Sequence, residues 1–124
     1  MTAKVWIVDD DSSIRWVLER TLGSEGFECE SFADGEALLS SLEMRSPDVI
    51  LSDIRMPGID GLSLREQIHR RQADLPIIIM TAHSDLDSAV NAYQRGAFEY
   101  LPKPFDIDEA VTLVRRAENH LKEQ

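Results

Sequence analysis

Short apolar runs alternate along this chain with longer stretches of helical periodicity. The five runs cover residues 5–8, 29–32, 49–52, 77–81 and 99–101, and three of them are almost continuously apolar. Strands that are buried on both faces have this composition, which is typical of a parallel sheet covered by helices on each side. The alternation therefore predicts an α/β fold.

The stretches between the runs have helical spacing. The first follows the candidate caps Asp11 and Ser12 and stops at Gly23. The other helices are expected over residues 35–44, 62–71, 84–95 and after 106. Because parallel strands need right-handed crossovers, we expect a flavodoxin-like (βα)5 fold, a doubly wound parallel five-stranded sheet with the order 2-1-3-4-5. Residues 1–124 would form one domain.

Composition excludes several classes of partner. The formal net charge of -10 has the wrong sign for binding a phosphate backbone or an anionic membrane surface, so we expect no direct nucleic-acid or membrane partner. No apolar run approaches the roughly 20 residues that span a bilayer. The single Cys29 cannot form an internal disulfide. These features predict a cytoplasmic protein.

Four of the apolar runs end at, or lead into, residues whose side chains can bind a metal or take part in a reaction. In open parallel sheets, ligands bind outside the carboxyl ends of the strands, so residues at those ends share one edge. The residues concerned are the adjacent Asp9, Asp10 and Asp11, then Asp53, Thr81 and Lys103.

The three adjacent aspartates have two interpretations. An aspartate before a helix often serves only as an N-cap, and one carboxylate is enough for that role. Three neighbouring carboxylates repel one another unless a cation is present. Oxygen ligands with space for water suit magnesium. The segment is therefore either a capped loop or a metal site.

Asp53, Thr81 and Lys103 each have a simple structural explanation, as a turn residue, a β-branched strand residue and a solvated cation. Together they supply what phosphoryl transfer needs. A carboxylate can attack phosphorus, while a hydroxyl and an ammonium can hold the non-bridging oxygens. Their shared position at strand ends favours phosphoryl chemistry.

Over essentially its whole length, the chain resembles the receiver domain of two-component response regulators. The residues that carry the resemblance are Asp9-Asp10, Asp53 with Met56-Pro57 and Gly61, Thr81-Ala82, and Lys103-Pro104-Phe105. The subgroup that it resembles most is the nitrogen-regulatory NtrC type, through the stretches VDDDSSIRWVLER, LSDIRMPGIDGL, IIIMTAHSDLDSAV and GAFEYLPKPFDIDEAV.

The resemblance implies the chemistry of the site. Asp53 would accept a phosphoryl group from a sensor kinase or a small phosphodonor. Asp10, the Asp53 carboxylate and the backbone carbonyl of Arg55 would bind Mg²⁺, with Asp9 acting through water. Whether Asp11 contributes to the metal site is left open, because family members often have an acid there that is not a ligand.

The resemblance also implies a conformational switch. Thr81 would form a hydrogen bond to the new phosphoryl group, Lys103 would pair with it, and Tyr100 would occupy the aromatic switch position. The surface formed by the helix over 84–95, the strand over 99–101 and the last helix would then change.

Partners follow from the same resemblance. A sensor histidine kinase, NtrB-like, would donate the phosphoryl group, and the chain would form the N-terminal part of a longer regulator with an output ATPase domain. Phosphorylation would favour a dimer. The resemblance therefore predicts a signalling receiver that catalyses only its own phosphorylation and dephosphorylation.

Two other functions use a related site. A magnesium-dependent phosphatase of the haloacid dehalogenase type also has an aspartate nucleophile, but it needs a second aspartate two residues later, where this chain has Arg55. A flavodoxin-like FMN-binding module would need a hydroxyl- and glycine-rich phosphate loop after the first strand, where this chain has three aspartates.

Overall fold

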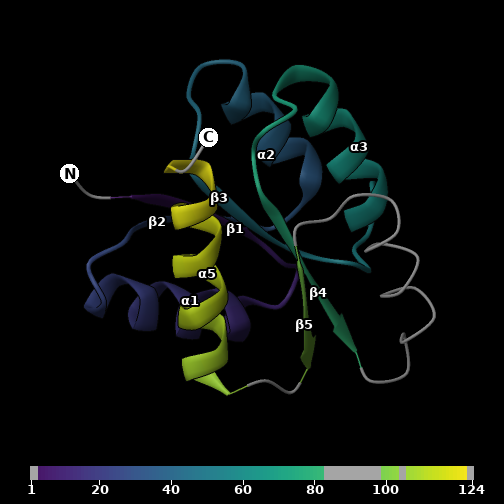
Figure 1. Cartoon of the computed structure of the whole chain (residues 1–124). Coiled ribbons are helices and arrows are strands. Elements are labelled where there is room, and N and C mark those ends of the chain that lie inside the picture. Colours follow the sequence, from purple (N-terminus) through teal and green to yellow (C-terminus); the bar gives the residue numbers. More distant parts are fainter. Residues whose placement is uncertain (1–2, 83–98, 104–105, 123–124) are drawn as a thin grey trace.

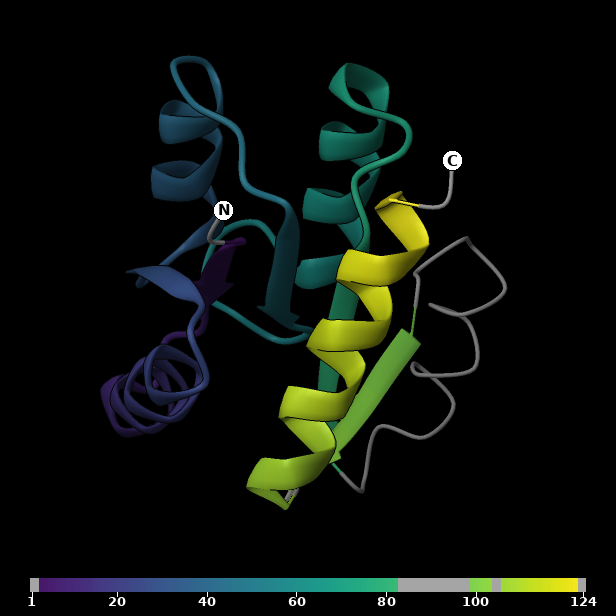
Figure 2. The same cartoon turned by 60° about the vertical axis from the view of Figure 1, so that its left-hand side comes forward.

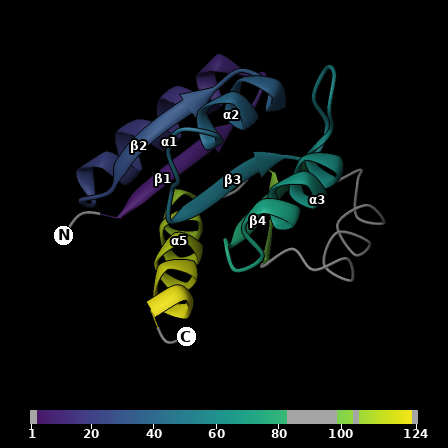
Figure 3. The same ribbon diagram turned by 90° about the horizontal axis from the view of Figure 1, so that it is seen from above.

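Five parallel strands form a single sheet in the computed structural model, which describes residues 3–82, 99–103 and 106–122. The order β2-β1-β3-β4-β5 is the order expected from the sequence, and β2, β1 and β3 can be followed side by side from above (Figure 3). The strands are β1 Lys4–Val8, β2 Glu28–Phe32, β3 Val49–Asp53, β4 Ile77–Ala82 and β5 Glu99–Lys103.

Helices cover both faces of the sheet (Figures 1 and 2). One layer contains α1 and α5 and the other contains α2 and α3, so the doubly wound arrangement is confirmed. The bounds are Ser12–Ser24 for α1, Gly35–Leu42 for α2, Gly61–Arg71 for α3 and Ile107–Lys122 for α5. The helix expected over residues 84–95 lies outside the described residues.

Helix α2 is shorter than the sequence predicted. It ends at Leu42 instead of residue 44, and the chain leaves the helix in a turn in which the backbone amides of Met44 and Arg45 both donate to the carbonyl of Ser41. Met44 is 85% exposed, so no packing favours extending the helix through it.

The central strand β3 explains why the core has two parts. All five of its residues are buried. Val49 and Leu51 pack in the layer with α1 and α5, whereas Ile50 packs in the layer with α2 and α3. Successive side chains of a strand point to opposite faces, so a continuous apolar run fills both layers at once. The buried central strand of the sheet therefore ends at Asp53.

Aspartate side chains begin three of the helices. Asp11 accepts from the backbone N–H of Ser13, and Asp34 and Asp60 accept in the same way at α2 and α3, each at 2.8 Å. Such caps satisfy free amides at the positive end of a helix. Part of the excess of acidic residues thus has a structural role.

None of the described helices is both long enough and apolar enough to cross a membrane.

Candidate functional site

Strand register brings the predicted strand-end residues to one edge of the sheet. Val8 pairs with Ser52, so Asp9 follows β1 next to Asp53, the last residue of β3. Asp53 is in turn paired with Met80, which places Thr81 one residue further along β4. At the end of β5, Pro102 and Lys103 pair with Thr81 and Ala82.

Three of the aspartates form a compact acidic cluster. One carboxylate oxygen from each of Asp9, Asp10 and Asp53 lies within 4.8 Å of the others. Asp9 is fully buried and Asp53 is 8% exposed, while Asp10 faces solvent. Buried carboxylates are costly unless they are paired or bind a cation. The cluster has the oxygen-only composition that hard divalent cations prefer.

The buried Asp9 is held at its amide, its carbonyl and its carboxylate. Its N–H donates to the carbonyl of Phe32 on β2, at 3.2 Å, and its Oδ1 accepts from the backbone N–H of Asp11 at 2.9 Å. The Asp9 carbonyl accepts from Nη1 of Arg15 at 2.6 Å. The loop after β1 is therefore fixed from β2, from α1 and from within itself.

Asp11 has a different position from its two neighbours. Its side chain accepts from the N–H of Ser13 and caps α1. Among the described acidic residues, the three whose oxygens converge are Asp9, Asp10 and Asp53. Asp11 therefore caps the helix, and the described acidic cluster is formed by the other three aspartates.

The loop after Asp53 returns closely to the end of its own strand. Ile54 donates its N–H to the Met80 carbonyl at 3.0 Å and accepts from the N–H of Gly61 at 2.9 Å. A Cβ on Gly61 would lie 2.4 Å from the carbonyl oxygen of Asp53 and 2.9 Å from Cα of Ile54. Only glycine permits this approach, which places the start of α3 against the candidate nucleophile.

The same loop needs a second glycine. Gly58 has φ = +80°, a conformation that glycine adopts without the strain that a side chain would add. The next residue, Ile59, donates its N–H to the Glu36 carboxylate at 3.3 Å. Arg55, whose carbonyl was predicted to bind magnesium, lies in this loop and is exposed.

Thr81 is buried in an unusual way. The residue has no exposed surface, and its Oγ1 has no hydrogen-bond partner in the part of the chain that the structure describes. An unpaired buried hydroxyl typically costs about 1–3 kcal/mol. Tyr100 is half-buried on β5, paired with Ile79. The side chain of Lys103 lies outside the described part of the structure, although its backbone ends β5.

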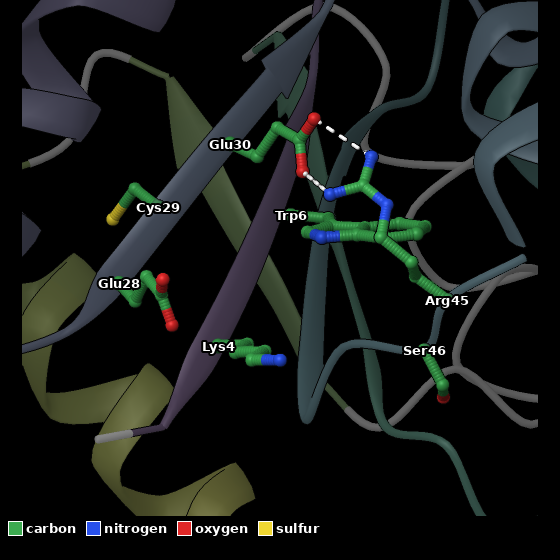
Figure 4. Close-up of a pocket in the computed structure, with 7 residues that line it drawn as sticks. All are labelled: Lys4, Trp6, Glu28, Cys29, Glu30, Arg45 and Ser46. Carbon is green, nitrogen blue, oxygen red and sulfur yellow. Dashed lines mark hydrogen bonds and ion pairs between the residues drawn. The ribbon is translucent and has the colours of Figure 1, made fainter.

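A hollow of about 290 Å³ lies at the other end of β1 and β2, lined by Lys4, Trp6, Glu28, Cys29, Glu30, Arg45 and Ser46 (Figure 4). Arg45 binds Glu30 through two hydrogen bonds, of 2.6 and 2.8 Å, and stacks over the ring of Trp6 at 5.4 Å. Burial raises the pKa of the Cys29 thiol to about 11, and the negative charge of Glu19 makes a smaller contribution in the same direction. That thiol is a poor nucleophile at neutral pH, and the hollow is separate from the acidic cluster.

Comparison with known proteins identifies the family of the chain. Residues 5–115 match the response regulator receiver domain. The chain belongs to this family. The receiver domain is 66% identical to the DNA-binding transcriptional regulator NtrC of Salmonella typhimurium over 97% of the chain, and it spans 26% of that relative.

Two solved structures of the NtrC receiver domain have the same architecture. The apo form has a TM-score of 0.86 at 65% identity, with 95% of each chain covered. The BeF3 activated form has a TM-score of 0.83 at 64% identity, with 97% of each chain covered. The predicted family and its NtrC-type subgroup are thereby confirmed.

Sequence reasoning missed two contacts of this receiver domain. The hydrogen bond from Arg15 to the Asp9 carbonyl has no signature in the helical pattern, because its partner is a backbone atom. The close approach of Gly61 to Asp53 was also missed. A glycine directly after the cap Asp60 was the available signal, since a helix start rarely needs glycine at that position.

Proposed function

We propose that this receiver domain is a phosphorylation-activated switch in which Asp53 accepts the phosphoryl group. The observation that carries the proposal is the nearly buried Asp53 carboxylate, which lies beside Asp9 and Asp10 at the carboxyl edge of the sheet. A carboxylate at the end of a rigid strand is held in place for attack, and positioning is the main contribution of a protein to phosphoryl transfer.

The transfer step is an in-line displacement at phosphorus. A carboxylate oxygen of Asp53 forms the new bond to phosphorus while the bond to the leaving group breaks. The leaving group is a histidine nitrogen of the kinase, or the acetate oxygen when acetyl phosphate is the donor. The product is an aspartyl phosphate, and the substrate is the protein itself.

The acidic cluster suits Mg²⁺. Ligand oxygens around this ion lie 2.0–2.1 Å from it, and opposite ligands are therefore about 4.2 Å apart. Carboxylate oxygens within 4.8 Å of one another can meet that geometry after small adjustments. Asp10, Asp53 and the Arg55 carbonyl would hold the ion, with Asp9 acting through water. Bound Mg²⁺ would neutralise the charge that gathers on the phosphoryl oxygens.

Thr81 and Lys103 would respond to the new charge. The unpaired hydroxyl of Thr81 is available as a donor to a phosphoryl oxygen, and Lys103 would contribute an ammonium from the end of β5. Movement of Thr81 would let Tyr100 turn inward. The surface formed by residues 84–95, β5 and α5 would then shift between two states.

The partners belong to this proposal. A sensor histidine kinase, NtrB-like, would be the donor, and an output ATPase domain would follow in the same polypeptide. The chain spans about a quarter of its NtrC relative, which its name describes as a DNA-binding transcriptional regulator. Activated receivers would dimerise, and the receiver itself would bind neither nucleic acid nor membrane.

The alternative functions lack support at specific positions. Arg55 stands where a haloacid dehalogenase phosphatase needs its second aspartate. A carboxylate cluster follows β1 where an FMN module needs a phosphate loop, and carboxylates repel the phosphate of a flavin nucleotide.

Incubation with acetyl phosphate tests the proposed function. With Mg²⁺ present, intact-mass measurement is expected to show one added phosphoryl group per chain. In excess chelator, incorporation is expected to fall by at least about tenfold, since the three clustered carboxylates then repel the incoming phosphoryl group. Equal incorporation with and without Mg²⁺ would contradict the metal site, and no incorporation under either condition would contradict the proposal itself.

A Thr81→Val variant separates stability from switching. Valine matches the shape of threonine and removes the unpaired hydroxyl, so the free energy of unfolding is expected to stay equal or to rise by about 1 kcal/mol. Phosphorylation at Asp53 should persist, while the phosphorylation-dependent change in the NMR signals of Tyr100 should disappear. A full Tyr100 response in the variant would exclude Thr81 from the switch.

A further inference from the structure

One arginine of α1 reaches back to the acidic loop. Nη1 of Arg15 donates to the carbonyl oxygen of Asp9 at 2.6 Å. Arg15 follows the N-cap Asp11 by four residues, and helical side chains lean toward the N-terminus of their helix. The guanidinium is therefore carried back over the first turn. A charged donor makes this hydrogen bond stronger than one between neutral groups.

The carbonyl that accepts this bond belongs to the peptide unit between Asp9 and Asp10. Because the peptide unit is planar, the direction of its carbonyl also fixes its N–H and the Cα of Asp10. The other contacts of the loop anchor Asp9, through its amide and its carboxylate. Within the described part of the chain, no hydrogen bond is made by the exposed carboxylate of Asp10. Its place beside Asp53 thus depends on the orientation of the backbone.

We propose that Arg15 is a positioning residue of the cation site: it orients the Asp9–Asp10 peptide so that the Asp10 carboxylate converges with those of Asp9 and Asp53. This inference rests on the proposed function, because the cluster must bind a cation. Arg15 does not contact the reacting atoms. Supporting groups of this kind commonly change metal affinity by about 10- to 100-fold when they are removed.

The charge of Arg15 and its hydrogen bond predict opposite changes in Mg²⁺ affinity when the side chain is replaced. A guanidinium near three carboxylates repels a divalent cation, so removing its charge alone should tighten Mg²⁺ binding. Removing its hydrogen bond should weaken binding, because Asp10 is then free to leave the cluster. The direction of the change therefore distinguishes positioning from charge.

The experiment measures the Kd of Mg²⁺ by calorimetry in the absence of any phosphodonor. Arg15→Met keeps most of the apolar stem and loses the donor and the charge, and we expect its Kd to rise about tenfold. Arg15→Lys keeps a charged donor, and its Kd should lie between those of wild type and Arg15→Met. The ¹⁵N shift of Asp10 should also move in the ion-free Arg15→Met protein, since its amide shares the released peptide unit.

Arg20→Met is the matched control. Arg20 lies on the same helix and stacks over Trp16 at 5.2 Å, so this variant loses the same charge without touching the loop. Its Kd should equal that of wild type or be slightly lower. A Kd for Arg15→Met that is equal to or lower than the wild-type value would overturn the inference.

The two proposals can fail separately. If wild type binds Mg²⁺ and the Arg15→Met value is unchanged, only the role of Arg15 is lost. If wild type does not bind Mg²⁺, the role of Arg15 and the proposed metal site both fall, while phosphorylation of Asp53 is still decided separately by the incubation with acetyl phosphate. If Arg15→Met does not fold, Arg15→Lys is measured in its place. A Kd of Arg15→Lys for Mg²⁺ that is equal to or lower than the wild-type value then overturns the inference.

Discussion

Asp53→Asn is expected to abolish phosphorylation of the receiver domain by acetyl phosphate. The substitution preserves the shape of a side chain that is 8% exposed and replaces the carboxylate nucleophile with an unreactive amide. Removing a nucleophile commonly costs more than about a thousandfold in rate. Intact-mass measurement after incubation with the donor and Mg²⁺ should therefore show no added phosphoryl group, while wild type is modified.

Asp60→Asn is the control for this experiment. Asp60 lies in the same loop and is exposed, and its side chain caps α3 by accepting from the N–H of Ser63. Asparagine caps helices as well as aspartate does, so the variant should fold and accept phosphate normally. Equal incorporation in Asp53→Asn and wild type would move the acceptor to another carboxylate, which peptide fragmentation would locate.

The sheet was predictable because its strands are buried on both faces. The run before Asp53 had to be central, since each of its apolar residues needs one of the two layers. The convergence of Asp9, Asp10 and Asp53 then follows from strand order and register. The sequence could not predict that α2 ends early, because the end of a helix varies by one or two residues and the apolar pattern does not show that Met44 is exposed.

The supporting contacts of the site were harder to predict than its acids. Asp9 and Asp11 have the same side chain two positions apart, yet one is fully buried in the cluster and the other caps α1. The difference arises from the direction in which the loop leaves β1. At this point Asp9 forms hydrogen bonds with Phe32 and Arg15, and the local pattern contains neither contact. The position of each carboxylate thus depends on contacts that only the folded chain makes.

The approach of α3 to β3 suggests a second large effect, at Gly61. A Cβ at this position would lie 2.4 Å from the carbonyl oxygen of Asp53 and 2.9 Å from Cα of Ile54. Both neighbours are backbone atoms and cannot rotate away as a side chain could. Gly61→Ala must therefore push the start of α3 away from the strand, which we expect to lower the free energy of unfolding by about 1–3 kcal/mol or more.

Urea denaturation of Gly61→Ala and Gly23→Ala separates this clash from a general effect of glycine replacement. Gly23 is in α1, and a Cβ there would meet nothing within 4 Å. Alanine is the better helix former, so Gly23→Ala should raise the free energy of unfolding by about 0.4–1 kcal/mol. Opposite signs for the two variants would confirm that the contact with Asp53 requires glycine. If Gly61→Ala were as stable as wild type, the loop would have room to move, and the position of Asp53 would not depend on the start of α3.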